Sequence, residues 1–275
     1  MKKYKSIIIF GSGRRTQQDI LPVLDHLKFP KNKIIIYAKN NKTIISRNQS
    51  YLVKSINECT QINNDDLIYI AVSTVSQIKV LQFVQKINKS SKIIIDTPAD
   101  FELIKNESLK NISISEDVVP LLSIMERRKV INKLFFNFLF FKKSAFKYHA
   151  ISFIEKINGP IFLQIKLLFF QLNISSRGIA IILFERNYEE GSINMNFKKI
   201  GFPHPLSQSE KKLIGGIGNQ DSFSSRFLEL KRIGLAELLF EALNNNSIVS
   251  VYDGIKHVKK SKIMNKKIGI NFFLS

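Results

Sequence analysis

The stretch that decides the fold is residues 6–16, which reads Ser-Ile-Ile-Ile-Phe-Gly-Ser-Gly-Arg-Arg-Thr. A β-branched apolar run ends at a Gly-x-Gly turn, and a helical pattern begins directly after it. The first glycine of such a turn permits a tight bend. The second lets the main chain approach a phosphate without a Cβ in the way. Thr16 stands at the third glycine position, so this nucleotide-binding fingerprint is incomplete. The stretch predicts a strand, a phosphate-binding turn and a helix N-terminus.

The first hundred residues repeat this alternation of strand and helix. Short apolar runs predict strands at residues 7–10, 34–37, 67–72, 93–95 and 112–114. Residues spaced for one helix face separate these runs, and Pro22 should bend the first of the helices. Continuous apolar strands separated by amphipathic helices are typical of a parallel sheet that is covered on both faces.

The pattern changes after about Pro120. Apolar runs at residues 153–157, 161–172, 179–184 and 193–200 predict strands with no helices between them, followed by a helix at 226–243. Such runs indicate an antiparallel or mixed sheet. The expected fold class is an α/β Rossmann domain with a doubly wound parallel sheet, followed by a smaller α+β domain with a mostly antiparallel sheet. We place the domains at residues 1–120 and 121–275, with the C-terminal helices packing back on the first domain.

The chain is strongly basic. Its 275 residues include 42 Lys and Arg against 22 Asp and Glu, for a net charge of +20. Such charge favours anionic partners. It is spread along the chain, however, and there is no helix-turn-helix, zinc-ligand spacing or base-stacking aromatic pattern. We therefore expect neither nucleic-acid binding nor a metal, and a protein that uses its charge on nucleic acid or a membrane surface is the third-ranked alternative.

The sequence contains no segment long enough to cross a membrane. Its most apolar stretch, residues 134–141, is far below the ~20 residues that a spanning helix needs. This stretch predicts a buried helix or strand, and an interfacial membrane contact is the alternative. No secretion signal is apparent, and the single cysteine, Cys59, excludes an internal disulfide. These features favour the cytoplasm.

Four segments in this order resemble the Gfo/Idh/MocA family of NAD(P)-dependent oxidoreductases, which act mainly on sugars and sugar derivatives. The first resembles the opening signature of that family, and the last two stand at the ends of its fourth and fifth strands. The segments are Gly11-Ser12-Gly13-Arg14, Leu21-Pro22, Ala71-Val72-Ser73-Thr74 and Asp96-Thr97-Pro98.

The resemblance implies an oxidoreductase that acts on a sugar, a nucleotide-sugar or a related polar carbonyl or hydroxyl compound. It also implies homo-oligomers that pair through the second-domain sheet, where Phe162, Leu168 and Phe170 contribute to an apolar face. The expected cofactor-binding residues are Gly11, Ser12, Gly13, Arg14, Lys39, Ser73, Thr74, Asp96 and Pro98.

The catalytic groups of the family are not all present. Thr97 stands where the Glu-Lys-Pro motif of the family has its lysine. A threonine hydroxyl can orient a substrate oxygen, but it cannot do the acid–base work of a lysine at neutral pH. The glycine-rich second-domain segment with an Asp and a His is also missing. Thr97 and the loop residue His204 are the catalytic candidates. The alternative is a non-catalytic relative that binds a nucleotide or sugar, or serves as a subunit partner.

The residues after the second predicted strand favour NADP over NAD. NAD-preferring folds place an Asp or Glu there to bind the ribose hydroxyls. Residues 37–42 read Tyr-Ala-Lys-Asn-Asn-Lys and offer no carboxylate. Lys39, Lys42 and Arg14 would attract the 2′-phosphate of NADP. NAD is the alternative cofactor, in which case these lysines are only solvated.

Overall fold

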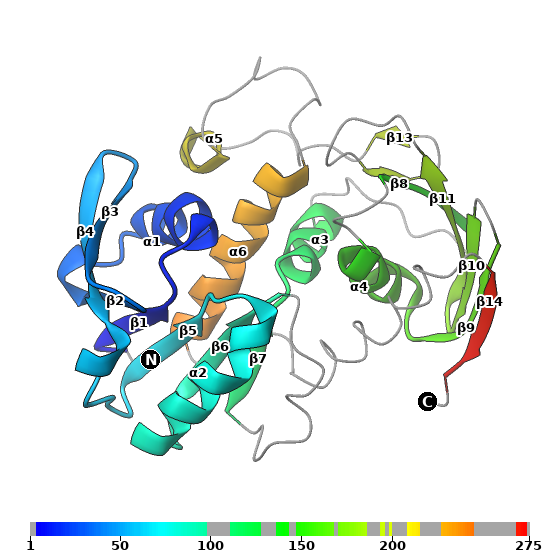
Figure 1. Ribbon diagram of the computed structural model, residues 1–275. Helices are drawn as coiled ribbons and strands as arrows, with labels where there is room; N and C mark the ends of the chain where they lie inside the picture. Colours follow the sequence, from blue (N-terminus) through cyan, green and yellow to red (C-terminus); the bar gives the residue numbers. More distant parts are fainter. Residues whose placement is uncertain are drawn as a thin grey trace. The chain divides into compact units, whose positions relative to one another are not determined.

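The computed structural model describes residues 4–97, 111–127, 136–142, 147–167, 170–185, 193–195, 198–199, 208–214, 227–244 and 268–273. The chain divides into two compact units (Figure 1). The first comprises Met1–Glu116 with Leu235–Ile255, and the second comprises Asp117–Gly234 with Lys256–Ser275.

The first unit is built on a seven-stranded sheet in the order β3-β4-β2-β1-β5-β6-β7. All neighbouring strands are parallel except β3 and β4, which are antiparallel. The strand order reverses beside β1 (Ser6–Phe10), as in a doubly wound Rossmann sheet, which confirms the predicted fold class. The strands are β1 (Ser6–Phe10), β2 (Ile34–Ala38), β3 (Lys42–Ser46), β4 (Gln49–Ser55), β5 (Asp66–Ile70), β6 (Lys92–Asp96) and β7 (Ile112–Ser115).

Both faces of this sheet are buried, as the continuous apolar runs predict. Ile7 and Ile9 of β1 are fully buried on one face, and Ile8 on the other face packs in a cluster with Leu81 and Val84 of α2. The helical segments of this unit are η1 (Thr16–Ile20), α1 (Leu21–His26), η2 (Lys31–Lys33), η3 (Ile56–Glu58) and α2 (Thr74–Ile87). Helix α6 (Phe227–Leu243) contributes its C-terminal part.

The first helix changes its winding where proline enters it. The turn η1 is π-helical, and the Leu21 N–H donates to the carbonyl oxygen of Thr16, five residues back. Pro22 stands in the first turn of α1 and has no N–H to donate. The sequence predicted a bend at Pro22, and the structure has a wide π-helical turn directly before the α-helix that contains this proline.

The hairpin of β3 and β4 was not predicted. Its turn residues Arg47 and Asn48 both have positive φ, at 47° and 65°. A two-residue turn of this kind usually contains glycine, so Arg-Asn gives a weak signal in the sequence. The chain passes through β3 between the parallel strands β2 and β4, where a helix is the usual connection. Ser46 Oγ donates to the Gln17 carbonyl oxygen at 2.6 Å and so binds the hairpin to η1.

The second unit contains a seven-stranded sheet in the order β13-β12-β8-β11-β10-β9-β14. Only the β8–β11 pair is parallel, so the prediction of a mostly antiparallel sheet is confirmed. The strands are β8 (Phe136–Lys142), β9 (Ile161–Lys166), β10 (Phe170–Ser175), β11 (Gly178–Glu185), β12 (Ile193–Met195), β13 (Lys198–Lys199) and β14 (Gly269–Phe272). The helices are α3 (Val118–Arg127), α4 (Lys147–Asn158), α5 (Gln208–Ile214) and the first part of α6.

Strand β8 accounts for the most apolar stretch of the sequence. It lies inside the sheet between β12 and β11. In the part of the chain that the structure describes, no helix has the length and apolar character needed to cross a membrane.

Three strand predictions in the second half were wrong. Residues 153–157 belong to helix α4, in which Ile151, Ile154 and Ile157 are buried at a spacing of three residues. Residues 161–166 and 170–172 belong to two antiparallel strands. Leu167 and Phe170, between which the chain reverses, each donate a main-chain N–H to the carbonyl oxygen of the other. The expected strand at 193–200 is likewise an antiparallel pair, β12 and β13.

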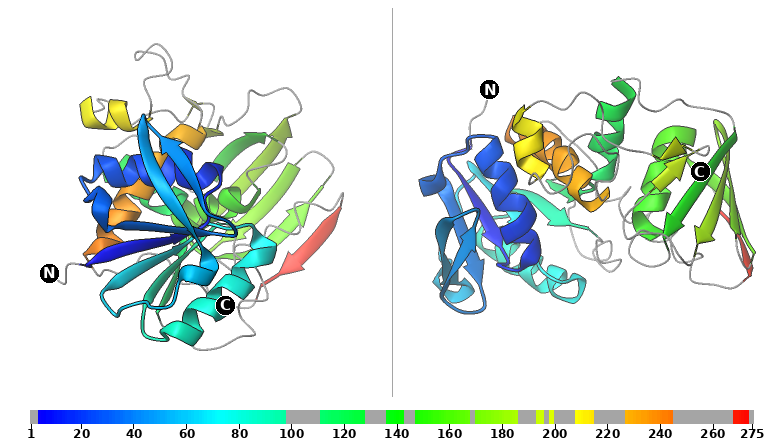
Figure 2. Two further views of the ribbon diagram at one scale, coloured as in Figure 1. Left: turned by 60° about the vertical axis from the view of Figure 1, so that its left-hand side comes forward. Right: turned by 90° about the horizontal axis from the view of Figure 1, so that it is seen from above.

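On β9 and β10 the polar side chains are buried and the apolar side chains are more exposed, which reverses the usual arrangement. Helix α4 covers one face of this sheet (Figure 2). On β9 and β10 that face carries buried polar side chains. Gln164 and Gln171 both donate through Nε2 to Asn173 Oδ1, at 2.9 and 2.6 Å, and Asn173 is fully buried. Leu172 and Ile174, which alternate with Gln171, Asn173 and Ser175 along β10, point to the opposite face and are partly exposed. On β9 and β10 the apolar side chains therefore lie on the more exposed face of the sheet.

We predict that Asn173→Ala destabilises the protein by about 2–4 kcal/mol, because two buried amide donors lose their acceptor. Chemical denaturation measures the change. Leu172→Ala, a neighbouring truncation on the open face, should cost less. Equal losses in the two variants would contradict the importance of the amide network.

Candidate functional site

The carboxyl ends of four adjacent parallel strands carry most of the predicted site residues. Gly11–Arg14 follow β1, and Lys39 follows β2. Ser73 and Thr74 come after β5, and Asp96 and Thr97 stand at the end of β6. Because β1, β2, β5 and β6 are neighbours, the fold brings these segments to one edge of the sheet. In doubly wound folds, ligands bind at this edge, where the strand order reverses.

The loop after β1 is shaped by bonds to its carbonyl oxygens. Thr16 Oγ1 donates to the Gly11 carbonyl at 2.7 Å, and Gln17 Nε2 donates to that of Ser12 at 2.8 Å. The Gln17 main-chain N–H donates to the Gly13 carbonyl at 3.1 Å. In a planar trans peptide the N–H points opposite to the C=O. With three successive carbonyls turned toward the helix, the N–H groups of residues 12–14 face away from it, as a phosphate cradle requires.

The two glycines of the loop have different roles. Gly11 has φ +118°, and a Cβ there would lie 2.2 Å from the carbonyl oxygen of Ala71. Gly11 is therefore needed by the fold, because the ends of β1 and β5 approach each other at this point. A Cβ on Gly13 would meet no heavy atom within 4 Å. Among the residues that the structure describes, none fills the space beside Gly13.

The end of β2 is a basic corner. Lys39 is exposed, and its carbonyl accepts a hydrogen bond from Ser55 Oγ at 3.4 Å. Lys42 begins β3, and Lys54 lies beside the end of β2 in β4. The nearby carboxylate of Glu58 accepts from the Ser55 main-chain N–H in a capping box. A phosphate at this corner would meet several ammonium groups.

Helix α2 begins at the same edge. Ser73 is its N-cap residue, and the Ser73 side chain makes no capping hydrogen bond to the helix. The Ser73 hydroxyl lies 3.2 Å from that of Ser76 instead. Thr74 opens the helix, and Val75 in its first turn is 81% exposed. Ser73 and Val75 are thus exposed at this edge.

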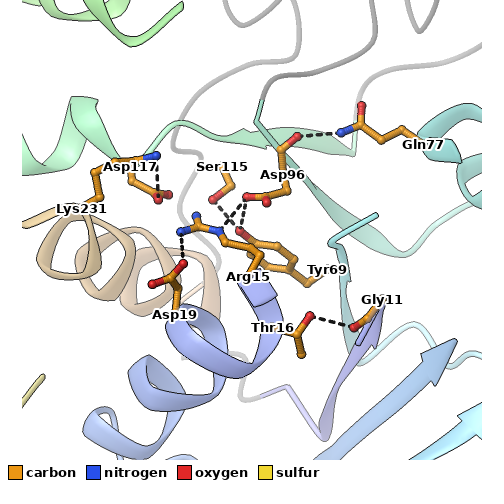
Figure 3. Close-up of polar contacts among 10 residues, drawn as sticks. All are labelled: Gly11, Arg15, Thr16, Asp19, Tyr69, Gln77, Asp96, Ser115, Asp117 and Lys231. Carbon is orange, nitrogen blue, oxygen red and sulfur yellow. Dashed lines mark hydrogen bonds and ion pairs between the residues drawn. The ribbon is translucent and has the colours of Figure 1, made fainter. Parts of the chain in front are cut away.

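A polar cluster joins the loop to the end of β6 (Figure 3). Arg15 Nε donates to Asp96 Oδ1 at 3.1 Å, and Arg15 Nη1 lies 3.3 Å from Asp19 Oδ2. The buried Tyr69 hydroxyl donates to Asp96 Oδ1 at 3.1 Å and lies 2.6 Å from Ser115 Oγ. The Asp96 carboxylate is thus held between a guanidinium and a phenol.

The main chain at the end of β6 is fixed as well. The buried Gln77 side chain of α2 donates through Nε2 to the Asp96 carbonyl at 2.9 Å. This bond sets the start of the segment that contains the half-buried Thr97. Pro98 and His204 lie outside the described residues, so their predicted roles remain predictions.

Sequence reasoning missed Arg15, Tyr69, Gln77 and Ser115 as parts of this edge. Tyr69 gave a usable signal, because it is a phenol within the continuous apolar run of β5. Arg15 directly follows Arg14, and the sequence does not indicate that the Arg15 side chain bonds Asp96 whereas that of Arg14 bonds Gln18.

Cys59 is not a nucleophile candidate. Its side chain is 3% exposed, and burial raises the pKa of the thiol, so the reactive thiolate is disfavoured. Within the described residues no three His, Cys, Asp or Glu side chains gather as metal ligands would.

No protein-family model matches the sequence, and no curated protein matches it. Solved structures of similar fold span almost the whole chain. Scyllo-inositol dehydrogenase from Lactobacillus casei is 12% identical, with a TM-score of 0.60 over 99% of both chains. An oxidoreductase from Agrobacterium radiobacter, in complex with NAD+, L-tartaric acid and magnesium, is 10% identical, with a TM-score of 0.60 over 98% of both chains.

Levoglucosan dehydrogenase in complex with NADH and levoglucosan is 9% identical, with a TM-score of 0.58 over 95% of this chain and 96% of that one. The chain thus has the two-domain oxidoreductase fold that the resemblance to the Gfo/Idh/MocA family predicted.

We predict opposite outcomes for alanine at the two loop glycines. Gly11→Ala should lower stability by roughly 3 kcal/mol, because the Cβ adds both strain and a clash with Ala71. Gly13→Ala should fold normally. Its Cβ would stand where a phosphate oxygen meets the main chain, so nucleotide affinity should fall about 10–100-fold.

Thermal unfolding and a titration with NADPH separate the two effects. A Gly13→Ala protein that binds NADPH as well as the parent chain would refute the phosphate cradle.

Proposed function

We propose that this protein is an NAD(P)-dependent oxidoreductase that acts on a sugar, a nucleotide-sugar or a related polar carbonyl or hydroxyl compound. The observation that supports this most directly is the loop after β1. Its carbonyl oxygens accept hydrogen bonds from Thr16 and Gln17, and a Cβ on Gly13 would meet no described heavy atom within 4 Å. The fold adds support, since dehydrogenases of similar architecture hold NAD+ or NADH. In this proposal residues 1–120 form the dinucleotide-binding domain, and residues 121–275 form the substrate and oligomerisation domain.

The cofactor that we propose is NADP. Main-chain N–H groups of Ser12, Gly13 and Arg14 would bind the diphosphate, with Gly11 holding the loop in shape. Lys39, with Lys42 beside it, would meet the 2′-phosphate of the adenosine ribose. A carboxylate in that position would instead favour the bare ribose of NAD.

The nicotinamide end would lie toward β5 and β6. We propose that Ser73 and Thr74 contact this half of the cofactor, and that Asp96 and Pro98 border it. The Arg15 and Tyr69 contacts hold the Asp96 carboxylate in place, so this border is preorganised before a ligand binds.

The nicotinamide supplies or accepts the hydride when it is bound. The residues of this chain then have two tasks. Thr97, next to Asp96, would orient the reacting oxygen of the substrate through its hydroxyl. A separate group must move the proton, because a threonine stays neutral at physiological pH. His204 is the candidate that we propose for this step, since imidazole titrates near neutral pH.

A second copy of this chain is the partner that we propose for the open face of the second sheet. Paired residues on β9, β10, β11 and β14 place one continuous set of apolar side chains on that face. Ile270 and Phe272 are 60% and 76% exposed. A continuous apolar surface of this kind favours burial against a partner. The face consists of Leu163, Ile165, Phe170, Leu172, Ile174, Ile179, Ile181, Ile270 and Phe272.

The cofactor proposal predicts a larger stabilisation by NADPH than by NADH. At 100 times its dissociation constant a ligand adds ~2.7 kcal/mol to the free energy of unfolding, which is several degrees in melting temperature. Lys39→Glu should weaken NADPH binding about tenfold or more, and NADH binding should stay equal or become tighter, because a carboxylate there accepts from the ribose hydroxyls. Lys79→Glu changes the charge equally on an exposed position of α2 and serves as the control. A preference for NADH in the parent chain would overturn the NADP assignment.

Activity is tested with the cofactor already bound. A panel of sugar and sugar-acid carbonyl compounds is added to the NADPH complex, and loss of the nicotinamide absorbance is followed. Oxidation by a member of the panel is expected, with rates that fall in Thr97→Val. Binding of NADPH with no turnover across the panel would favour the non-catalytic alternative.

The oligomer is tested by light scattering. The parent chain should be a dimer or larger at micromolar concentration, and Ile270→Lys should yield monomers, because a lysine buried in a dry interface is not solvated. Leu52→Lys is the matched control, since Leu52 is 67% exposed on the first sheet. A monomeric parent chain would refute this interface.

A further inference from the structure

A cavity of about 340 Å³ lies in the first unit, away from the site described above. It opens at the edge where the strands begin, since its lining residue Tyr4 precedes β1 and Lys33 precedes β2. The loop of Gly11 stands at the opposite end of β1, roughly 16 Å away for a strand of this length. The cavity is therefore separate from the proposed cofactor site.

The walls of the cavity are mostly carbon. Leu27, Phe29 and Pro30 line it from the segment after α1, and Phe240 and Leu243 line it from the last turns of α6. Phe240 is 51% exposed, which is unusual for a phenylalanine on a helix with many buried neighbours. The polar side chains of the lining belong to Tyr4, Asn244 and two lysines. The contiguous apolar wall favours an alkyl chain over a sugar, which needs several converging hydrogen-bond partners.

Two lysines belong to the lining of this cavity. Lys28 and Lys33 both line it and are both exposed. Lysines near a helix C-terminus often serve only to satisfy its last carbonyls. Here α1 ends in a main-chain motif that does so without them, because the Phe29 N–H donates to the Leu24 carbonyl and the Lys28 N–H to the Asp25 carbonyl, each at 2.9 Å.

The backbone of Lys28 is a second, independent observation. Lys28 has φ +55°, the left-handed conformation that glycine adopts most readily at the end of a helix. A side chain at this position costs conformational energy, and such strain is concentrated at functional sites. Lys28 thus lines the cavity from a position that glycine would occupy with less strain.

We propose that this cavity binds an amphiphilic anion, namely a medium-chain aliphatic carboxylate. The alkyl chain lies against Phe29, Phe240 and Leu243, and the carboxylate is paired with the ammonium groups of Lys28 and Lys33. The volume is that of a pocket for a small ligand. This site does not depend on the proposed oxidoreductase activity, since it shares no residue with the cofactor site.

The test is calorimetric titration of the full chain with decanoate below its micelle concentration, and with decanol as the uncharged analogue. Lys28→Gly removes the ammonium and relieves the backbone at the same time. We expect this variant to weaken decanoate binding about fivefold and to leave decanol binding unchanged, with an equal or higher melting temperature. Phe240→Ala should weaken the binding of both ligands.

Lys31→Gln is the control for net charge. Lys31 is in the same loop, but its ammonium lies 5.1 Å from the centre of the Tyr51 ring and does not line the cavity. Equal weakening in Lys31→Gln and Lys28→Gly would show general attraction to a basic protein and overturn the site. Unchanged affinity in Phe240→Ala would place the alkyl chain elsewhere, for example on the open face of the second sheet, and would also overturn it. The absence of heat with decanoate would do the same.

Discussion

The orientation of three peptide groups after β1 determines what the first sheet can bind. Thr16 and Gln17 donate hydrogen bonds to the carbonyl oxygens of residues 11–13. If these carbonyls faced the mouth of the sheet, their partial negative charge would repel a diphosphate. Turned inward, they leave the N–H groups and the N-terminus of the first helix to face the ligand. The same bonds explain how the loop tolerates a threonine where the usual motif has its third glycine.

Thr16 also shows why the site could be predicted only in part. The run of apolar residues, the two glycines and the helix pattern were enough to place the turn at the carboxyl end of β1. They did not reveal that the third glycine could be replaced by a hydroxyl that bonds the loop, together with a π-helical turn before Pro22. Local patterns specify the elements, whereas contacts between distant residues such as Arg15 and Asp96 depend on how the strands are ordered.

The second sheet was harder to predict for a related physical reason. Alternating polar and apolar residues mark two faces of a strand, but they do not say which face is covered. In β10 the buried residues are Gln171, Asn173 and Ser175, so the usual assumption that the apolar face is inside gives the wrong answer. Helix α4 was mistaken for a strand because Phe153, next to Ile154, makes the sequence look like a continuous apolar run and obscures the three-residue spacing of the buried isoleucines.

The chemistry of the first unit limits what that unit can contribute to a reaction. Arg15 stays protonated at any physiological pH, and Thr97 stays neutral. The Asp96 carboxylate is held in position at the end of β6 by Arg15 and Tyr69. In the proposed function, the described groups at this edge bind and orient the ligands. A further group such as His204 would then move the proton, so the proposed reaction depends on that residue as well as on the nucleotide loop.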